Sequence, residues 1–320
     1  MKIAFNGIGC GWGNNGGTQS VFRMADALNE LGVETEMWAH CPSRFTWFKP
    51  KTPVRVCTLD NAPAVDVLIN AGCNTTMSTY NYPRKKVGVQ WLRGHEVWAK
   101  SDSQLRKLYN LPMVLWTNSE WLSDMVKDMT DVQYADVQYC GIPVDDFYKV
   151  SRSTDGVRVG ALWSTKPLKR GQLALDIFND PKLAGCKFVM FGNEPGPPGV
   201  EYIQQPTMEQ KRKLMSMCDI WLATSEMEGL HIPPMEAALC GATIIAPARP
   251  QAGVSDYCIN GLSGLTYASH SSAVECIRRL HDVPLRNDMN VRALSLIRDK
   301  VGDVDMNAKR MIERLEKELL

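Results

Sequence analysis

The segment from residue 228 to residue 241, EGLHIPPMEAALCG, constrains the fold of this chain more than any other stretch. Residues 220–224 before it and 242–246 after it are short apolar runs with the character of buried strands. The two adjacent prolines suit the start of a helix, where a missing N–H costs nothing, and Gly241 suits its end. The segment therefore predicts a strand, a loop, a helix and a strand in succession, as in a parallel α/β sheet.

Two carboxylates stand eight positions apart in this unit. We expect Glu228 in the loop at the carboxyl end of the first strand and Glu236 in the first turn of the helix. Open α/β sheets bind their ligands at that edge. Carboxylates there can bind the hydroxyls of a sugar or ribose, while free backbone N–H groups at the helix start face an anion.

The same segment resembles the Glu-x7-Glu signature of retaining glycosyltransferases with the GT-B fold, in particular the family-four type (glycosyl transferases group 1). That signature reads roughly E-G-x-G-x-P-x-x-E-A-x-x-x-G-x-P-V. His231 replaces its second glycine and Thr243 replaces a proline. The positions that match are Glu228, Gly229, Pro233, Glu236, Ala237 and Gly241.

The resemblance implies a nucleotide diphosphate sugar as donor substrate, such as a UDP- or GDP-sugar, and no cofactor. It implies that Glu236 holds the ribose hydroxyls. It also implies that Glu228 and the backbone of the four residues after it hold the sugar; these four residues are Gly229, Leu230, His231 and Ile232.

Apolar strand-like runs alternate with amphipathic segments along the whole chain, which is the pattern of doubly wound parallel sheets. The resemblance implies the GT-B arrangement of two Rossmann-like domains facing a central cleft. We expect an acceptor-side domain over residues 1–150 and a nucleotide-sugar-binding domain over 151–305, with the polar stretch 151–156 as linker. Residues 306–320 are predicted to form an amphipathic helix that returns to the first domain.

Residues 7–17 hold six glycines, between the first predicted strand, which starts at residue 2, and the first predicted helix. They spell G-x-G-x-x-G, with Glu36 about twenty residues further on, as in dinucleotide-binding proteins. An NAD(P)-dependent oxidoreductase is therefore an alternative. We consider it weaker, because Glu36 falls inside the second predicted strand, residues 33–38, and because this function leaves Glu228 and Glu236 unexplained. The resemblance instead implies that Gly16 and Gly17 face the donor diphosphate and the acceptor.

Three basic residues, Lys166, Lys169 and Arg170, follow the first strand of the second predicted domain. The resemblance implies an arginine and a lysine in this loop, which stabilise the charge that develops on the leaving diphosphate. The arginine position falls on Ala161, so Lys166 is the candidate replacement. Lys169 or Arg170 matches the lysine, and the sequence leaves open which of the three contacts the diphosphate.

Basic and aromatic residues alternate in the stretch 43–55 of the first predicted domain, where the resemblance places the acceptor. We expect acceptor contacts there from Arg44, Trp47, Lys49 and Lys51, together with Arg93 from the segment Arg93-Gly-His-Glu96. His95 in that segment is a candidate catalytic residue that binds a sugar hydroxyl or stabilises the transition state.

Several acceptors fit this pattern of charges and rings. A glycan or lipid-linked acceptor is slightly favoured. DNA with hydroxylated bases, as in a phage-type enzyme, is the alternative, because cations and stacking rings suit a nucleic acid. An anionic lipid surface or an ordinary solvated loop also fits, and a non-catalytic protein that binds nucleotide sugars is a further rival.

Composition limits the remaining classes. The net charge is +1, so no whole-domain electrostatic footprint for nucleic acid is present. The ten cysteines form no C-x-x-C pair, which favours reduced core residues of a cytoplasmic protein. There is no signal-peptide pattern at the start and no apolar run long enough to span a membrane. Asp303-Val-Asp305 resembles a D-x-D metal site, but we interpret it as a charged helix start and expect no metal.

Overall fold

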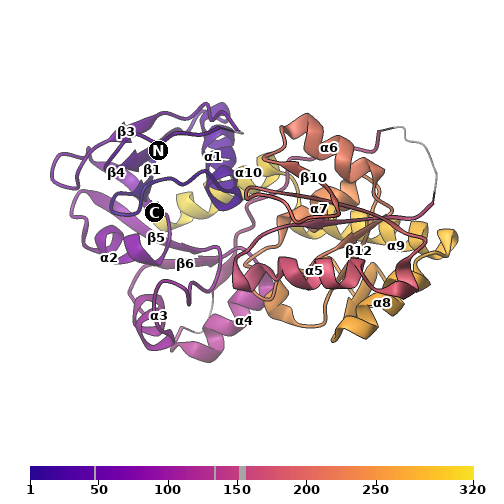
Figure 1. Cartoon of the computed structure of the whole chain (residues 1–320). Coiled ribbons are helices and arrows are strands. Elements are labelled where there is room, and N and C mark those ends of the chain that lie inside the picture. The colour runs from indigo at the N-terminus through magenta and orange to yellow at the C-terminus, as the bar shows by residue number, and fades with distance from the viewer. Residues whose placement is uncertain (47, 133–134, 151–155) are drawn as a thin grey trace. The chain divides into compact units, whose positions relative to one another are not determined.

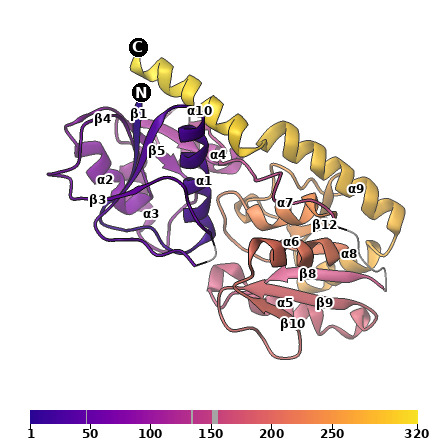
Figure 2. The ribbon, with the colours of Figure 1, turned by 90° about the horizontal axis from the view of Figure 1, so that it is seen from above.

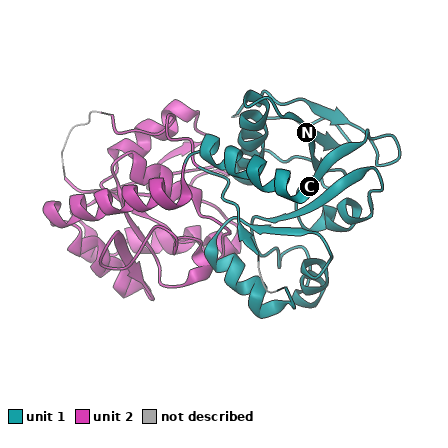
Figure 3. Cartoon of the chain, turned by 180° about the vertical axis from the view of Figure 1, so that it is seen from behind, with its two compact units in different colours: residues 1–141, 303–320 teal, residues 142–302 magenta. Residues whose placement is uncertain are grey.

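A computed structural model describes residues 1–46, 48–132, 135–150 and 156–320 (Figure 1). Of the predicted positions, Trp47 and most of the predicted linker, residues 151–155, lie outside these ranges. The chain divides into two compact units, shown in Figure 3. Unit 1 comprises Met1–Gly141 and Asp303–Leu320, and unit 2 comprises Ile142–Gly302.

Unit 1 is built on a seven-stranded sheet in the order β3-β2-β1-β4-β5-β6-β7, and all of its strand pairs are parallel. Its strands are β1 (Lys2–Gly7), β2 (Glu34–Ala39), β3 (Val54–Val56), β4 (Val65–Asn70), β5 (Lys85–Leu92), β6 (Val114–Thr117) and β7 (Asp136–Val137). Its helices are α1 (Gly16–Glu30), α2 (Cys73–Asn81), α3 (Asp102–Tyr109), α4 (Glu120–Met129) and α10 (Val304–Leu319).

Unit 2 is built on a six-stranded parallel sheet in the order β10-β9-β8-β11-β12-β13. Its strands are β8 (Arg158–Leu162), β9 (Lys187–Gly192), β10 (Glu201–Gln204), β11 (Ile220–Leu222), β12 (Thr243–Pro247) and β13 (Gly264–Tyr267). Its helices are α5 (Gly171–Phe178), α6 (Met208–Met217), α7 (Ile232–Leu239), α8 (His270–Arg279) and α9 (Val283–Leu296). Short helical turns are η1 (Pro167–Lys169), η2 (Pro181–Leu183), η3 (Pro250–Ala252) and η4 (Ile297–Val301).

Both sheets confirm the predicted doubly wound α/β class. The central strands are buried on both faces, as β12 illustrates with five buried residues in succession. In unit 2 the predicted order of strand, loop, helix and strand is present as β11, the Glu228 loop, α7 and β12. The carboxyl ends of β8, β11 and β12 therefore lie side by side, because these strands are parallel neighbours. This edge holds the candidate site.

Helix α10 returns to unit 1 and packs against α1, as Figure 2 also shows. Its buried face includes Ala308, Met311 and Leu315. The chain leaves and re-enters unit 1 through two segments that touch each other. A Cβ at Gly141, where φ is +70°, would lie 2.5 Å from the carbonyl oxygen of Asp303, so only glycine fits there. None of the helices in the described ranges is long and apolar enough to cross a lipid bilayer.

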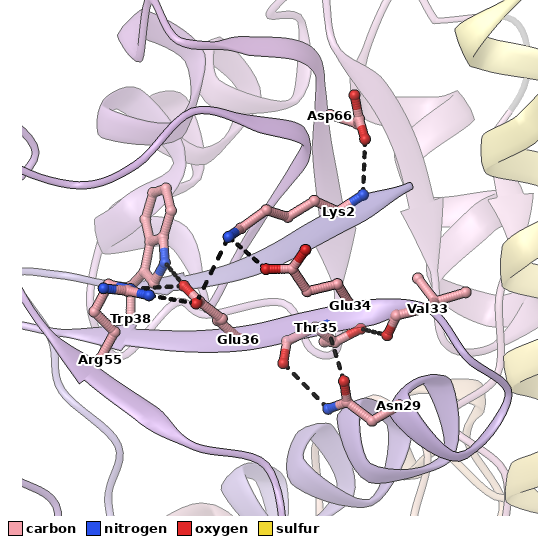
Figure 4. Close-up of polar contacts among 9 residues, drawn as sticks. All are labelled: Lys2, Asn29, Val33, Glu34, Thr35, Glu36, Trp38, Arg55 and Asp66. Atoms are coloured by element: carbon pink, nitrogen blue, oxygen red, sulfur yellow. Dashed lines mark hydrogen bonds and ion pairs between the residues drawn. The ribbon is translucent and has the colours of Figure 1, made fainter.

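Glu36 lies inside β2, and its carboxylate is fully engaged (Figure 4). Its two oxygens accept hydrogen bonds from Arg55 at 2.5 and 2.7 Å and from the indole of Trp38 at 3.2 Å, and Lys2 Nζ is 3.8 Å away. A dinucleotide site would need this carboxylate free at the end of the strand to bind a ribose. In this structure the carboxylate of Glu36 instead binds neighbouring side chains of unit 1. It is therefore not available to bind a ribose, as it would have to be in an oxidoreductase.

The same cluster makes the stability of unit 1 depend on pH. Hydrogen bonds from Arg55 lower the pKa of Glu36 to about 2, against the opposing effect of burial. A folded pKa below the ordinary value means that the stabilisation is complete above about pH 4.5 and is lost as the pH falls through about 2. We therefore expect Glu36→Gln to lower Tm by several degrees at neutral pH, and this difference should shrink near pH 2.

Thermal denaturation of both proteins at a series of pH values checks this expectation. Glu34→Gln is the matched control, since Glu34 pairs with Lys2 at 2.6 Å but its side chain is 63% exposed, and exposed pairs contribute little. A Tm difference for Glu36→Gln that stays constant from neutral to acid pH would contradict the assignment.

Candidate functional site

The loop that carries Glu228 connects β11 to α7 and is held by the segment after β12. The N–H of Glu228 donates to the carbonyl of Gln251 at 2.8 Å, and the N–H of His231 donates to that of Gly253 at 2.9 Å. Gly253 has a φ of +69°, and a Cβ there would lie 2.9 Å from the Cβ of Glu228. Glycine at 253 thus lets this segment approach the Glu228 loop closely and hold it in place.

Lys169, at the end of η1, is the cation paired with Glu228. Its Nζ lies 2.5 Å from Glu228 Oε1. Two hydrogen bonds to backbone carbonyls join the loops that carry the pair: the Thr224 hydroxyl donates to the Lys169 carbonyl at 2.9 Å, and the Glu226 N–H donates to the Leu168 carbonyl at 2.7 Å. The loops after β8 and β11 therefore form one connected structure around the ion pair.

Among the described residues, the other two basic residues of the β8 loop form no ion pair with Glu228. Arg170 adopts a left-handed backbone with φ 51°, and it lines a small cavity of about 100 Å³ with residues that follow β12 and β13. Lys166 is exposed. Of the three cations that the sequence proposed for the diphosphate, Lys169 is the one that the structure brings to the carboxylate.

The electrostatics of the pair follow from its burial. Burial raises the pKa of the Glu228 carboxyl, but His231, which is charged only in acid, the charge of Lys169 and hydrogen bonds from Lys169 and Ser225 outweigh it, so the pKa lies below its ordinary value. His231 Nε2 is 3.8 Å from Glu228 Oε1, and burial lowers the pKa of His231 to about 4. The imidazole is therefore neutral near pH 7, and Lys169 is the cation that balances Glu228 there.

Glu236 lies in the second turn of α7, because that helix begins at Ile232, and the prediction of a first-turn position was wrong. The residue is 1% exposed. Its Oε2 lies 2.5 Å from Nζ of Lys211 on α6. Sequence reasoning missed Lys211. Its spacing could have indicated it: Lys211 precedes Leu214 by three residues and Met215 by four. This spacing places the lysine on the buried face of an amphipathic helix.

The backbone from Gly229 to Ile232 leads into α7. His231 is the N-cap and forms no side-chain cap bond. Ile232, Pro233 and Pro234 are the first three residues of α7. The prolines have no N–H, so of these three only Ile232 can donate a backbone hydrogen bond to a ligand. Leu230 and His231 are buried and anchor the loop. The predicted set of amides facing an anion is thus smaller than the Glu-x7-Glu pattern alone suggests.

The glycine-rich loop of unit 1 is braced by Arg93. The guanidinium donates to the carbonyl of Gly17 at 2.7 Å and also to the carbonyl of Ala71, so it ties the start of α1 to the loop after β4. Asn15 caps α1 by accepting from the Thr18 N–H at 2.9 Å. A Cβ at Gly16 would meet no atom within 4 Å. The predicted acceptor residue Arg93 therefore has backbone partners in this structure.

His95 is held by both of its ring nitrogens. Nε2 lies 2.8 Å from Asp102 Oδ1, and Nδ1 lies 3.1 Å from the hydroxyl of Tyr109. The neighbouring Glu96 accepts from the N–H of Cys73 at the start of α2. His95 is only 7% exposed. The geometry fits a histidine that anchors its loop, and its catalytic role stays a prediction.

The basic stretch 43–55 is partly neutralised within unit 1. Lys51 pairs with Glu30 at 2.5 Å, and Arg55 pairs with Glu36. Two aromatic rings of the stretch pack inward on α1, since the Phe22 ring lies 5.0 Å from Phe45 and 6.2 Å from Phe48. The predicted acceptor residues Arg44 and Lys49 are exposed.

No group of three metal-ligating side chains occurs in the described ranges. Asp303 instead caps α10, and its carboxylate accepts from the N–H of Met306 at 2.7 Å. This agrees with the interpretation of Asp303-Val-Asp305 as the start of a helix.

No family model matches this chain. No curated protein matches it by sequence. Several solved structures are similar to this chain. The chain is 17% identical to HepE of Anabaena, solved with UDP-glucose, with a TM-score of 0.80 over 99% of this chain and 100% of that one. It is 12% identical to a sucrose-phosphate synthase of Thermosynechococcus elongatus, with a TM-score of 0.82 over 99% and 98% of the two chains.

A third similar structure is an alpha-glucosyltransferase in complex with UDP and a 13-mer DNA containing an HMU base. It is 14% identical to this chain, with a TM-score of 0.67 over 99% of each chain. At these identities the similarity establishes the fold alone. The two parallel sheets and these likenesses together show that the chain has the GT-B fold of glycosyltransferases, as the sequence predicted.

Proposed function

We propose that this chain is a retaining glycosyltransferase, which transfers a sugar from a nucleotide diphosphate sugar to an acceptor hydroxyl. The observation that carries the proposal is the pair of Lys169 and Glu228, 2.5 Å apart at the carboxyl ends of β8 and β11. This edge is where open α/β sheets bind ligands. A lysine beside a carboxylate there provides one group for a diphosphate and one for sugar hydroxyls.

Each residue then has a defined role in unit 2. Glu236 accepts hydrogen bonds from the ribose hydroxyls, and Glu228 with the loop that follows it accepts them from the sugar. Lys169 moves toward the diphosphate and stabilises the negative charge that grows on it as the bond to the anomeric carbon breaks. The acceptor oxygen attacks from the same face, and its proton passes to the departing phosphate oxygen, so the anomeric configuration is retained.

Similar structures support a uridine donor, since HepE was solved with UDP-glucose and the alpha-glucosyltransferase with UDP. We place the acceptor on unit 1 and favour a glycan or lipid-linked acceptor over DNA. Lys51 and Arg55 pair with carboxylates, and Lys86 pairs with Asp66 at 2.7 Å, so part of the positive charge that a phosphate backbone would need is balanced within unit 1. DNA remains the second candidate, because one similar structure holds a DNA acceptor.

Nucleotide release from UDP-, GDP-, ADP- and dTDP-sugars tests the proposal. Each donor is assayed alone, with glycan or lipid-linked acceptors, and with hydroxymethylated duplex DNA. Release that rises with one acceptor class identifies it. Binding of a nucleotide sugar without release, with every acceptor, would support a binding protein instead. Binding of NAD(P) and of none of these donors would overturn the proposal in favour of an oxidoreductase.

Two substitutions separate the roles of the carboxylates. Glu236→Ala should raise KM for the donor by roughly tenfold or more, because a hydrogen bond to a charged group contributes about 1.5–3 kcal/mol. Glu228→Ala should mainly lower kcat. Glu275→Ala is the control, since this glutamate on α8 is 68% exposed and pairs with Arg278. Unchanged kinetics in both site variants would disprove the site.

A further inference from the structure

The ion pair between Lys211 and Glu236 is the most enclosed charge pair near the candidate site. The two side chains are 13% and 2% exposed, and their charged atoms are 2.5 Å apart. A buried carboxylate is costly unless a cation lies against it, so the position of Lys211 bears directly on the orientation of Glu236. No other ion pair to Glu236 is present among the described residues.

The ammonium of Lys211 is confined by two aromatic rings. It lies 5.1 Å from the ring centre of Phe147 and 5.5 Å from that of Phe191, which are cation–π distances. Phe191 belongs to β9, and Phe147 lies in the segment that leads into unit 2. With Glu236 on α7, three separate parts of unit 2 therefore enclose a single lysine head group.

The segment of Phe147 is itself tied to α6. Arg212, next to Lys211, donates to the carbonyl of Asp146 at 3.2 Å and stacks 4.5 Å from the ring centre of Tyr148. The hydroxyl of Ser216 donates to the carbonyl of Tyr148 at 3.2 Å. These contacts place the Phe147 ring against the lysine. The enclosure of Lys211 is thus preorganised before any ligand arrives.

We propose that Lys211 is a positioning residue for the nucleoside. By its ion pair with Glu236 it fixes the carboxylate in one orientation, in which the carboxylate accepts from a ribose hydroxyl. Lys211 itself makes no contact with the donor. The inference rests on the proposed function, in which Glu236 binds the ribose. It follows that the Lys211–Glu236 pair makes the protein prefer ribonucleotides to deoxyribonucleotides.

The test compares UDP with 2′-deoxy-UDP and 3′-deoxy-UDP by titration calorimetry. The wild-type protein should bind UDP roughly ten- to a hundredfold more tightly than the weaker deoxy form, as expected for a hydrogen bond to a charged group. In Lys211→Met, UDP binding should weaken to the level of the deoxy forms, while their own binding changes little. Lys211→Arg, which keeps the charge, should regain part of the preference.

Lys213→Met is the matched control on the same helix. Lys213 pairs with Glu209 at 2.7 Å, but both side chains are more than 60% exposed, so its preference should equal that of the wild type. If Lys211→Met does not fold, Lys211→Gln takes its place, because it removes the charge but keeps a polar group beside Glu236, and it should also bind UDP and the deoxy forms nearly equally.

The outcomes separate the two proposals. A wild-type protein that binds UDP but shows no preference over either deoxy form overturns the inference. A Lys211→Met variant, or Lys211→Gln if it is the one that folds, also overturns the inference if it keeps the preference or loses affinity for all three ligands equally. If nucleotide release identifies a donor with another base, the same comparison uses that nucleoside diphosphate and its deoxy forms. A wild-type protein that binds none of UDP, GDP, ADP and dTDP overturns the proposed function itself.

Discussion

A Lys169→Met variant should release nucleotide from the donor about a hundred to a thousand times more slowly than the wild type. The lysine ammonium lies 2.5 Å from Glu228 at the edge where the diphosphate would leave, and its side chain is 31% exposed, so a ligand can reach it. Removing the charge leaves the growing negative charge of the diphosphate without its counter-ion. Steady-state kinetics with saturating donor and acceptor measure the loss as kcat.

Three further variants show whether the effect belongs to Lys169. Lys182→Met, in the exposed turn η2, removes a lysine charge from the same unit and should leave kcat unchanged. Lys166→Met and Arg170→Met should each cost far less than Lys169→Met, because neither residue is paired with Glu228. A large loss in Arg170→Met with a normal Lys169→Met would move the diphosphate site to the cavity that Arg170 lines.

Replacing Arg286 by methionine should destabilise unit 2 by about 3–5 kcal/mol, which corresponds to a Tm lower by roughly 10 °C. Arg286 Nη2 lies 2.9 Å from Asp219 Oδ1, and the two side chains are only 11% and 6% exposed. The second oxygen of Asp219 accepts from the N–H of Arg158 at 3.0 Å. The variant therefore removes the arginine that lies against a buried carboxylate directly before β11, whose carboxyl end leads to Glu228.

The same helix supplies the control. Arg292 on α9 pairs with Asp288 at 2.9 Å, but these side chains are 52% and 57% exposed, so Arg292→Met should cost less than about 1 kcal/mol. Arg286→Met/Asp219→Asn should recover much of the lost stability, because it also removes the buried negative charge that Arg286 balances. Urea denaturation measures all three variants. Equal losses in Arg286→Met and Arg292→Met would refute the argument from burial.

The sequence predicted the parts of the fold that depend on local pattern. Alternating apolar and amphipathic runs gave the two parallel sheets, and the segment around Glu228 gave the order of strand, loop, helix and strand correctly. The position of Glu236 was wrong by about one residue. The helix begins at Ile232, before both prolines, so Glu236 is the fifth helical residue and falls just beyond the first turn.

Partners across the fold could not be predicted in the same way. Lys211 and Glu236 lie 25 positions apart in sequence, and nothing local to either one indicates the pair. The basic stretch 43–55 looked like a cationic surface because it contains no acidic residue. Its counter-charges come from Glu30 and Glu36, which belong to α1 and β2 and become neighbours only after folding. Such pairings are set by topology.

The return of α10 to unit 1 has a consequence for the order of synthesis. Residues 303–320 complete unit 1, yet all of unit 2 is translated before them. At usual rates of translation, roughly ten to thirty seconds pass between the end of the first segment of unit 1 and the arrival of α10. During that interval the face of α1 that α10 covers stays open on the nascent chain. Unit 2 can therefore finish folding first, although unit 1 begins the chain.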